Sequence, residues 1–563
     1  MKKVWAIALC LVVVLGLFAG CKQNKEDVKN GIRYDEQGRQ IITIGIPQKT
    51  TVQDYNTNAY TLWLEEVSGY NIEWVLYSSS AGDYKTQLAT ALINQSEPLP
   101  DILFGFKGLG DGVWSQYGED EYFIDLTDYM MDKEGKAKVW WDRAAELDPD
   151  YVDHIIKSAT GDNGRIYAFP RVEETVIDTM NSMGYINQEW LTKLNLKMPT
   201  DPESLYNVLK AFRDQDPDGN GKNDQIPMVC GGPNTGTGTG DGISWIINMF
   251  LYFDQGEYFA LSEDGQNVTI PFTSDKFREA LIFCRKLYDE GLIHPSVFTI
   301  STEEMKSLLN PAEGECKVGI GFGHPTLLME YGHDAVYNWA PLEYHGCVVR
   351  NMNQNTYDTF ITEDAADVDA CWNLLMIMCS EESAIRQRYG AEGINWVKAD
   401  EGAKSFLGLD AKIKLLKDPF GAIGNECLNN VSATILRGAE NEYVQVDESD
   451  KWQVAKMNLM KGIYENYVKA EQNNNPKYLI PSIIYDKEED LLTEDERSNV
   501  KSFFKMYRMA FIIGSDGLDP TKDDHWEFYI SELEANGLNT WYEQVSRLYV
   551  EDGYRDKVLA NAG

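Results

Sequence analysis

The sequence predicts an α/β protein in which a mostly parallel sheet is covered by helices. Strand-like and helix-like segments alternate through residues 41–104, the order typical of a parallel sheet with helices on its faces. The 563 residues are enough for two or more domains with substantial cores. The part after residue 400 is mainly helical in pattern, so we expect a helical C-terminal region there.

The predicted elements of the first sheet follow one another closely. Strands are expected at 41–47, 72–77 and 98–104, and helices at 62–67 and 83–94. Pro47 closes the first strand, and Ser68 with Gly69 stops the first helix. Later helices are expected at 244–251, 275–288 and 368–378, with a glycine-broken strand and turn at 317–325.

The N-terminus is typical of a secretory signal peptide, with a basic start, an apolar run from Val4 to Phe18 and the small residues Ala19 and Gly20. Cys21 then follows, and this arrangement resembles a bacterial lipobox. The resemblance implies that residues 1–20 are removed and that Cys21 carries lipid. Residues 21–40 are predicted to be a flexible tether. The alternative is plain secretion with Cys21 as an ordinary thiol.

The charge of the chain excludes several kinds of partner. With 51 Lys and Arg against 89 Asp and Glu, the net charge is −38. Such a surface repels phosphate backbones, so nucleic acid is not expected as a partner. It also disfavours binding of the globular body to anionic lipid, which leaves the lipid anchor as the membrane attachment. Seven scattered cysteines between Cys230 and Cys427 are interpreted as buried thiols.

Several stretches resemble extracellular solute-binding proteins of ABC importers, the maltodextrin- and alginate-binding type. They are LPDILFGFK from Leu99, GRIYAFPRVEETVIDTMNSMGYINQEWLTKL from Gly164, and RQRYGAEGINW from Arg386, typical of a large lipoprotein branch. The resemblance implies a two-lobed fold of type II with a hinge between the lobes. It places the N-lobe at 41–175 and 348–400 and the C-lobe at 176–347. The helical region at 401–563 would then pack on both lobes.

The same resemblance implies candidate ligand contacts near the cleft. Aromatic faces can stack on sugars, and carboxylates can accept hydrogen bonds from hydroxyls. The candidates are Lys107, Trp114, Glu173, Glu174, Phe322, His324 and Trp396. The alternative for each aromatic is packing in a core, and for each carboxylate a solvated surface.

Residues 216–224 match the first half of an EF-hand loop. Asp216, Asp218 and Asn220 stand at ligand positions 1, 3 and 5, Lys222 offers its carbonyl at 7 and Asp224 stands at 9. Gly221 supplies the sharp turn, but Pro227 stands where the bidentate Glu is usual, and Gln225 occupies position 10. The loop predicts a structural Ca²⁺ site. A solvated turn rich in Asp, Asn and Gly is the alternative.

The sequence therefore predicts a monomeric, lipid-anchored receptor on the outer face of a Gram-positive cell membrane. It would bind an oligosaccharide and deliver it to the permease of an ABC importer. No GxSxG or HExxH motif occurs, so no catalytic residues are assigned and an enzyme is not expected. The alternatives are a receptor for a peptide or another small solute, a secreted carbohydrate-active enzyme, and a surface adhesin.

Overall fold

The computed structural model describes most of the chain after residue 26. The described residues are 27–29, 31–94, 98–106, 109, 111–145, 149–170, 180, 183–232, 239–311, 316–331, 333–349, 357–417, 419, 423–428, 442–485 and 487–561.

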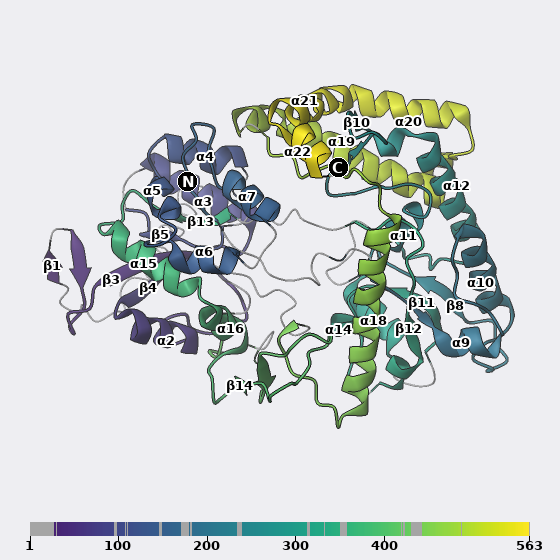
Figure 1. Ribbon diagram of the computed structural model, residues 1–563, viewed down its shortest axis with the longest axis horizontal. Coiled ribbons are helices and arrows are strands. Elements are labelled where there is room, and N and C mark those ends of the chain that lie inside the picture. The colour runs from purple at the N-terminus through teal and green to yellow at the C-terminus, as the bar shows by residue number, and fades with distance from the viewer. Residues whose placement is uncertain are drawn as a thin grey trace, which may run out of the picture.

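Two β-sheets form the centres of two lobes that lie side by side (Figure 1). The sheet of the first lobe has the order β4-β3-β5-β13-β6. Its strands are β3 (Ile41–Pro47), β4 (Asn71–Tyr77), β5 (Ile102–Leu103), β6 (Phe169–Pro170) and β13 (Tyr357–Ile361). β3 pairs in parallel with β4 and β5, whereas β13 is antiparallel to β5 and β6. The predicted α/β class is therefore confirmed, and a distant segment adds the antiparallel strand.

Helices surround this first sheet. They are α2 (Ala59–Ser68), α3 (Ala81–Asn94), α4 (Asp111–Glu119), α5 (Thr127–Met131), α6 (Lys138–Ala144), α7 (Pro149–Ser158), α15 (Val368–Met378) and α16 (Glu381–Tyr389). α2 begins three residues before the predicted helix, because the Asn58 side chain accepts a hydrogen bond from the Tyr60 amide and caps the helix. β5 is shorter than predicted, since Pro98 and Pro100 have no amide hydrogen to donate to a neighbouring strand.

The sheet of the second lobe has the order β12-β7-β11-β8. Its strands are β7 (Gly184–Asn187), β8 (Ile226–Val229), β11 (Val318–Phe322) and β12 (Trp339–Pro341). The central strand β11 is parallel to β8 and antiparallel to β7. A small separate sheet pairs β9 (Ala260–Leu261) with β10 (Val268–Thr269).

The second lobe also carries short and long helices. They are α9 (Gln188–Lys193), α10 (Pro202–Asp214), α11 (Gly242–Ile247), α12 (Asp275–Asp289), α13 (Thr302–Leu309), α14 (Pro325–Leu328), and the 3-10 helices η1 (Pro271–Thr273) and η2 (Asp334–Asn338). α10 begins as predicted, because the Asp201 carboxylate accepts from the Ser204 amide and Pro202 takes the first helical position.

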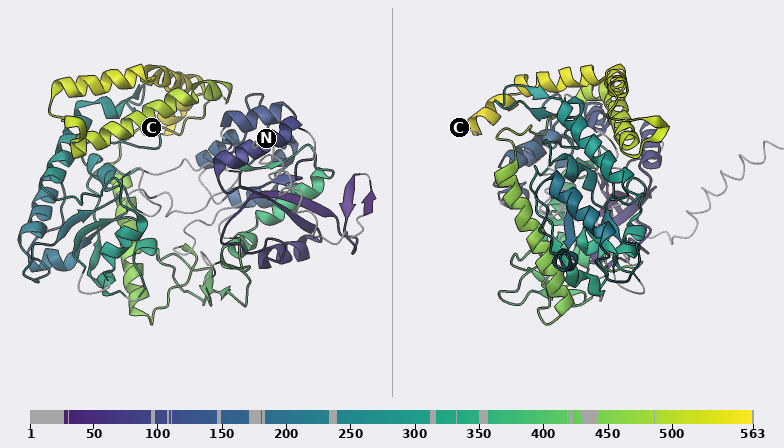
Figure 2. Two further views of the ribbon diagram at one scale, coloured as in Figure 1. Left: turned by 180° about the vertical axis from the view of Figure 1, so that it is seen from behind. Right: turned by 90° about the vertical axis from the view of Figure 1, so that its right-hand side faces the viewer.

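The C-terminal helices extend the second lobe. They are α18 (Lys451–Asn474), α19 (Lys487–Ile513), η3 (Ser515–Gly517), α20 (Asp523–Ala535), α21 (Leu538–Glu551) and α22 (Tyr554–Asn561). Their buried side chains belong to one hydrophobic core together with those of the second lobe. Their contacts with the first lobe include an ion pair between Lys557 and Asp153. The helical region therefore shares its core with the second lobe and also touches the first, where α19 packs against α4 and Lys557 pairs with Asp153 (Figure 2).

The described chain passes repeatedly between the two lobes. It passes from β6 to β7 and from β12 to β13. It then contributes Phe406 and Leu407 to the second core, returns to the first core at Leu428 and reaches the second again at Val446. Along this part of the chain a small core forms around β14 (Trp396–Lys398) and β15 (Ile413–Leu415). Repeated crossings leave each lobe its own core, so the lobes can move as separate bodies about the connecting segments.

The N-terminal part of the described chain differs from the predicted tether. β1 (Asp27–Lys29) and β2 (Ile32–Tyr34) form an antiparallel hairpin, at the edge of the first lobe that is far from the second (Figure 2). The Arg33 guanidinium lies 2.9 Å from Glu73 of β4, and the Asp35 carboxylate accepts from the Arg39 amide. These contacts order the polar segment beside the lobe. The sequence did not predict them, because the segment has no apolar periodicity.

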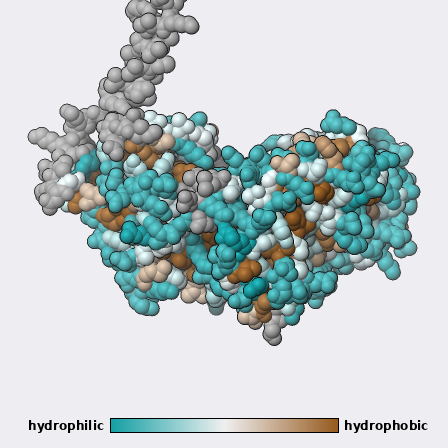
Figure 3. All heavy atoms as spheres, turned by 90° about the horizontal axis from the view of Figure 1, so that it is seen from above, coloured by the Kyte–Doolittle hydropathy of each residue, from teal (hydrophilic) through white to brown (hydrophobic). Residues whose placement is uncertain are grey.

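The state of the cysteines and the polarity of the surface agree with what the composition predicts. None of the seven cysteines that the structure describes forms a disulfide, and all but Cys347 are buried. In the described ranges, no helix combines the length and apolarity that crossing a membrane requires. Seen from above, the surface is mainly hydrophilic and its outline is indented between the lobes (Figure 3).

Candidate functional site

A pocket of about 390 Å³ lies between the lobes. Its first wall is α7 of the first lobe, and its other walls are the loop after α11, the end of α18, the segment 475–484 and α22 (Figure 1). Residues more than 400 positions apart in the chain therefore line one cavity. A site built from both lobes is where a hinged protein can enclose a small molecule.

One wall of this pocket is acidic. Asp254 and Glu257 come from the loop after α11, and Glu471 comes from α18. Asp254 is only 8% exposed, and its Oδ1 accepts from the Gly256 amide at 2.6 Å. Burial raises the pKa of Asp254 to about 6. Burial, together with the three carboxylates, also raises the pKa of the neighbouring Tyr252 well above its usual value.

A second part of the lining, on α7 and α22, carries the basic side chains together with Asp153. His154 and Lys157 lie on α7, and Lys557 lies on α22. The Lys557 ammonium is 3.0 Å from a carboxylate oxygen of Asp153, and the Lys157 ammonium is 5.1 Å from the centre of the Tyr554 ring. Each lysine thus has a partner on the other side of the junction between α7 and α22. These contacts join the first lobe to the last helix of the chain.

The floor of the pocket is apolar. It is formed by Leu479, Ile480, Pro481, Ile484 and Val558. Tyr554 is 8% exposed, and its hydroxyl accepts from the Ile484 amide at 3.3 Å, so the ring is fixed against the floor. An apolar floor with polar groups on two walls suits a small molecule that has both carbon faces and hydroxyl groups.

Three of the predicted ligand contacts are core residues in this structure. Trp114 and Phe322 are fully buried, in the cores of the first and the second lobe. Trp396 is 4% exposed in the small third core, where its indole donates to the Gly390 carbonyl at 2.9 Å. The structure does not bring these three side chains together. The core-packing alternative describes their surroundings, because each ring fills the space between elements of its own core.

The remaining predicted contacts are placed differently. His324 is half-buried and stands directly before α14, after the end of β11 and Gly323. Lys107, Glu173 and Glu174 lie outside the described residues, as does the predicted lipidation site Cys21. Of the predicted ligand residues that the structure describes, none lines the pocket. The pocket residues stand in no local motif, and the high aromatic content of the chain was the only sequence signal for such a site.

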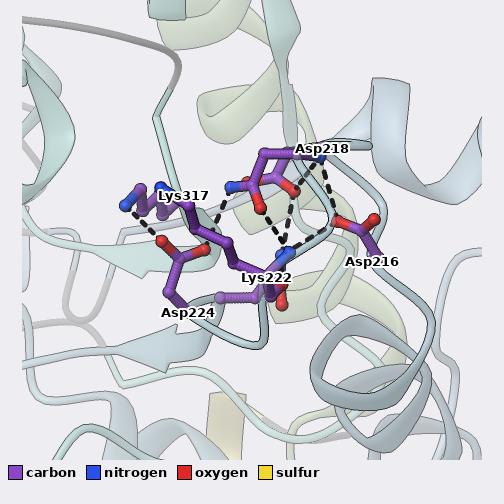
Figure 4. A network of polar contacts seen from close by, with 7 residues as sticks. Asp216, Asp218, Lys222, Asp224 and Lys317 are labelled. Atoms are coloured by element: carbon purple, nitrogen blue, oxygen red, sulfur yellow. Dashed lines mark hydrogen bonds and ion pairs between the residues drawn. The ribbon is translucent and has the colours of Figure 1, made fainter.

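The predicted calcium loop follows α10 and leads into β8. The turn requires positive φ angles at Asp216 (46°), Gly219 (71°) and Gly221 (74°). The two glycines adopt these angles without strain, and Asp enters this region more readily than most residues. Asp216 accepts from the Gly221 amide at 2.9 Å, and Asn220 Oδ1 accepts from the Lys222 amide at 2.7 Å. Asn220 also donates to Asp218 and Asp224, so the five predicted ligand residues lie close together. Figure 4 shows four of them, Asp216, Asp218, Lys222 and Asp224.

Gln225 reaches into the middle of this loop. Its Nε2 donates to Asp218 Oδ1 at 2.9 Å, to the Lys222 carbonyl at 3.0 Å and to Asp216 Oδ1 at 3.3 Å. The side chain is 9% exposed, and its Oε1 has no hydrogen-bond partner in the described part of the chain. The amide nitrogen thus touches three oxygens that a cation would use, while the amide oxygen is buried and unsatisfied.

Asp224 forms an ion pair with a lysine from outside the loop. Its Oδ2 lies 2.5 Å from the ammonium of Lys317, the residue that precedes β11 (Figure 4). This ion pair lowers the pKa of Asp224. Among the described residues, no three His, Cys, Asp or Glu side chains already converge on a metal position. In the loop, Asp224 pairs with Lys317 and also accepts from Asn220, while Gln225 bridges Asp216 and Asp218. The donor set itself, of carboxylates, an amide oxygen and a backbone carbonyl, is the kind that Ca²⁺ prefers.

No family model matches the chain. Comparison with individual proteins does find similar sequences. The fructooligosaccharide ABC transporter substrate-binding protein FusA of Streptococcus pneumoniae is 23% identical over 588 residues, covering 98% of both chains. Lipoprotein LipO of Bacillus subtilis is 34% identical over 297 residues, which is 52% of this chain and 51% of LipO.

Solved structures agree on the fold over almost the whole length. An extracellular solute-binding protein from Bifidobacterium longum subsp. infantis superposes with a TM-score of 0.70 at 19% identity, covering 92% of this chain and 99% of its own. An EF-hand mutant of FusA in complex with fructo-nystose gives a TM-score of 0.65 at 21% identity, covering 92% and 100%. These likenesses show that the chain has the fold of extracellular solute-binding proteins, with a pocket between its two lobes.

Proposed function

We propose that this protein is the receptor of an ABC importer and captures an oligosaccharide outside the cell. The observation that carries the proposal is the similarity to FusA over 98% of both chains, since FusA is named as a fructooligosaccharide substrate-binding protein. The lobes are connected by repeated passages of the chain and enclose a pocket with polar and apolar lining, which supports ligand capture by hinge closure. The receptor would bind the sugar and pass it to the permease without changing it.

Titration of the mature body with kestose and with a panel of longer glycans tests this proposal. Calorimetry should show a single site, and small-angle scattering should show that the protein becomes more compact when ligand saturates it. Ligand that binds only the folded state also raises the melting temperature. Release of reducing sugar from the same glycans would identify an enzyme instead. No binding to any glycan in the panel would contradict the receptor function.

We infer that the loop at 216–225 holds a structural Ca²⁺ ion. Asp216, Asp218, Asn220, Asp224 and the Lys222 carbonyl would be the ligands. The Gln225 amide is suited to supply a sixth oxygen after a half-turn, which would pair its buried Oε1 with the cation and replace the missing glutamate. The naming of an EF-hand in FusA supports such a site in this fold. The ion would fix the link between α10 and β8.

We further propose attachment of the protein to the membrane through lipid on Cys21. The signal-like segment before Cys21 and the similarity to a protein named as a lipoprotein support this. Cys21→Ser should prevent incorporation of a labelled fatty acid and release the protein from the membrane fraction, because lipid chains provide the attachment. Absence of label from the wild-type protein would contradict the lipid anchor while leaving the sugar receptor untouched.

A further inference from the structure

We propose that the pocket between α7 and α22 receives one end of the ligand as an uncharged sugar unit and discriminates against sugars that carry a carboxylate. The inference rests on the proposed receptor function and narrows its substrate class. It is built on the pocket lining, which includes the acidic group Asp254, Glu257 and Glu471, the phenol of Tyr252, and Tyr554 with the apolar residues.

The first step concerns polar groups that have no protein partner. Within the described residues, neither the Tyr252 hydroxyl nor the Glu471 carboxylate makes a hydrogen bond or an ion pair, although both line the pocket. They come from two different elements, the loop after α11 and α18. A carboxylate accepts hydrogen bonds and a phenol hydroxyl can accept or donate them, which matches the hydroxyl groups of a sugar.

The second step concerns charge. The acidic wall carries three carboxylates, whereas Lys557 on α22 is paired with Asp153 and Lys157 lies over the Tyr554 ring. A uronate in this pocket would place a fourth carboxylate beside the acidic wall. Like charges brought together out of water repel one another, so the wall selects against acidic sugars.

The third step concerns size and shape. A volume of about 390 Å³ is at the lower end for small-molecule pockets, so it suits the end of an oligosaccharide and not a long chain. Tyr554 and the apolar floor offer carbon surface to one face of a sugar ring. The hydroxyl-bearing edge of the ring would then face Tyr252 and Glu471.

The test compares two probes on three proteins by calorimetry. The probes are the neutral trisaccharide kestose and the acidic trisaccharide trigalacturonate. The proteins are the wild type, Glu471→Gln and the control Glu465→Gln, which changes an exposed carboxylate on the same helix α18 outside the pocket. Wild type and control should bind kestose alike and trigalacturonate at least tenfold more weakly. Glu471→Gln should weaken kestose by roughly tenfold, because a charge-assisted hydrogen bond becomes a neutral one.

Tyr252→Phe gives a second, independent arm, because it removes only a hydroxyl and leaves the ring in place. It should weaken kestose by roughly fivefold with an unchanged melting temperature. Kestose binding that neither variant changes would overturn the pocket proposal and leave the receptor function intact. Equal affinity for both sugars, or tighter binding of a glucosamine trimer than of kestose, would overturn the preference for uncharged sugars. Failure of wild-type protein to bind any glycan would instead overturn the receptor function.

Discussion

The loop at 216–225 and the pocket between α7 and α22 both bring carboxylates together. In the loop these groups are close in the sequence, whereas in the pocket they are far apart in it. The loop takes its groups from ten consecutive residues and satisfies them largely with its own amides and Gln225. The pocket takes them from residues 153–157, 252–257, 471–484 and 554–561. The loop can therefore keep its shape when the lobes move, whereas the pocket exists only while the lobes hold their arrangement.

This difference assigns different roles to the two regions. A local, self-satisfied loop is suited to a permanent structural ion. A cavity shared by two lobes is suited to a ligand that comes and goes, since closure and release change its walls together. Four expected results test the contrast, from the largest effect on stability to the smallest.

The largest effect should come from a core residue that belongs to neither region. Phe322 is fully buried and its ring centre lies 5.3 Å from that of Trp245. Phe322→Ala should lower the free energy of unfolding by about 3–5 kcal/mol, because it leaves a cavity in the second lobe. Urea unfolding measures this loss, and the more conservative Phe322→Leu should lose less. Weaker kestose binding at unchanged stability would return Phe322 to the ligand site and weaken the assignment of recognition to the pocket.

The same contrast explains what could be predicted from the sequence. β3 and α15 begin and end where the sequence predicts, because a closing proline and a cap at Asp367 are local signals. The capped start of α10 and the loop after it are local as well. The pocket is not, since Tyr252, Glu471 and Lys557 are ordinary residues in their own segments and acquire a role only through the fold.

Aromatic residues show that a local sequence resemblance does not by itself identify a ligand contact. Trp114 and Trp396 stand in stretches that resemble cleft segments, yet both are buried in cores. An aromatic side chain can pack in a core or stack on a sugar ring. Only its neighbours in the folded structure show which of these two roles it has. The N-terminal hairpin was missed for the related reason that Arg33 finds its partner Glu73 forty residues away.

The second expected effect concerns the pH dependence of Asp254. Its folded pKa of about 6 lies above the usual carboxyl value of 3.8, so the folded state disfavours the charged form. Stability from this group is therefore highest below pH 4, falls as the pH rises toward 6, and stays low above it. Asp254→Asn should stabilise the protein by roughly 3 kcal/mol at pH 8 and by almost nothing at pH 4.

Urea unfolding of Asp254→Asn and wild type at several pH values measures that difference. Glu465→Asn, an exposed change on α18, is the control and should show no such trend. A difference between Asp254→Asn and wild type that is constant from pH 4 to pH 8 would mean that Asp254 is not a buried charge. Asp254 would then no longer distinguish the acidic part of the pocket from a solvated surface.

The third expected effect concerns calcium in the loop. At a Ca²⁺ concentration 100 times the dissociation constant, binding should stabilise the folded protein by about 2.7 kcal/mol. Asp218→Ala should abolish this gain, and Gln225→Ala should reduce it, because each removes an oxygen from the proposed coordination. Lys317→Gln should increase calcium affinity, since it frees Asp224. Thermal unfolding with calcium and with chelator measures all four proteins, and a gain that survives Asp218→Ala would place the ion elsewhere.

The smallest effect should come from the contact that joins α22 to α7. Lys557 and Asp153 are each about half exposed, with side-chain exposures of 52% and 49%, so solvent screens their attraction. A double-mutant cycle of Lys557→Gln and Asp153→Asn should give a coupling energy below about 1 kcal/mol, and 1 M salt should remove most of it. The pair can then break at little cost when the lobes separate, as a reversible pocket requires. A coupling well above 1 kcal/mol that survives high salt would show that α22 is fixed to the first lobe, and the pocket would then be as permanent as the loop.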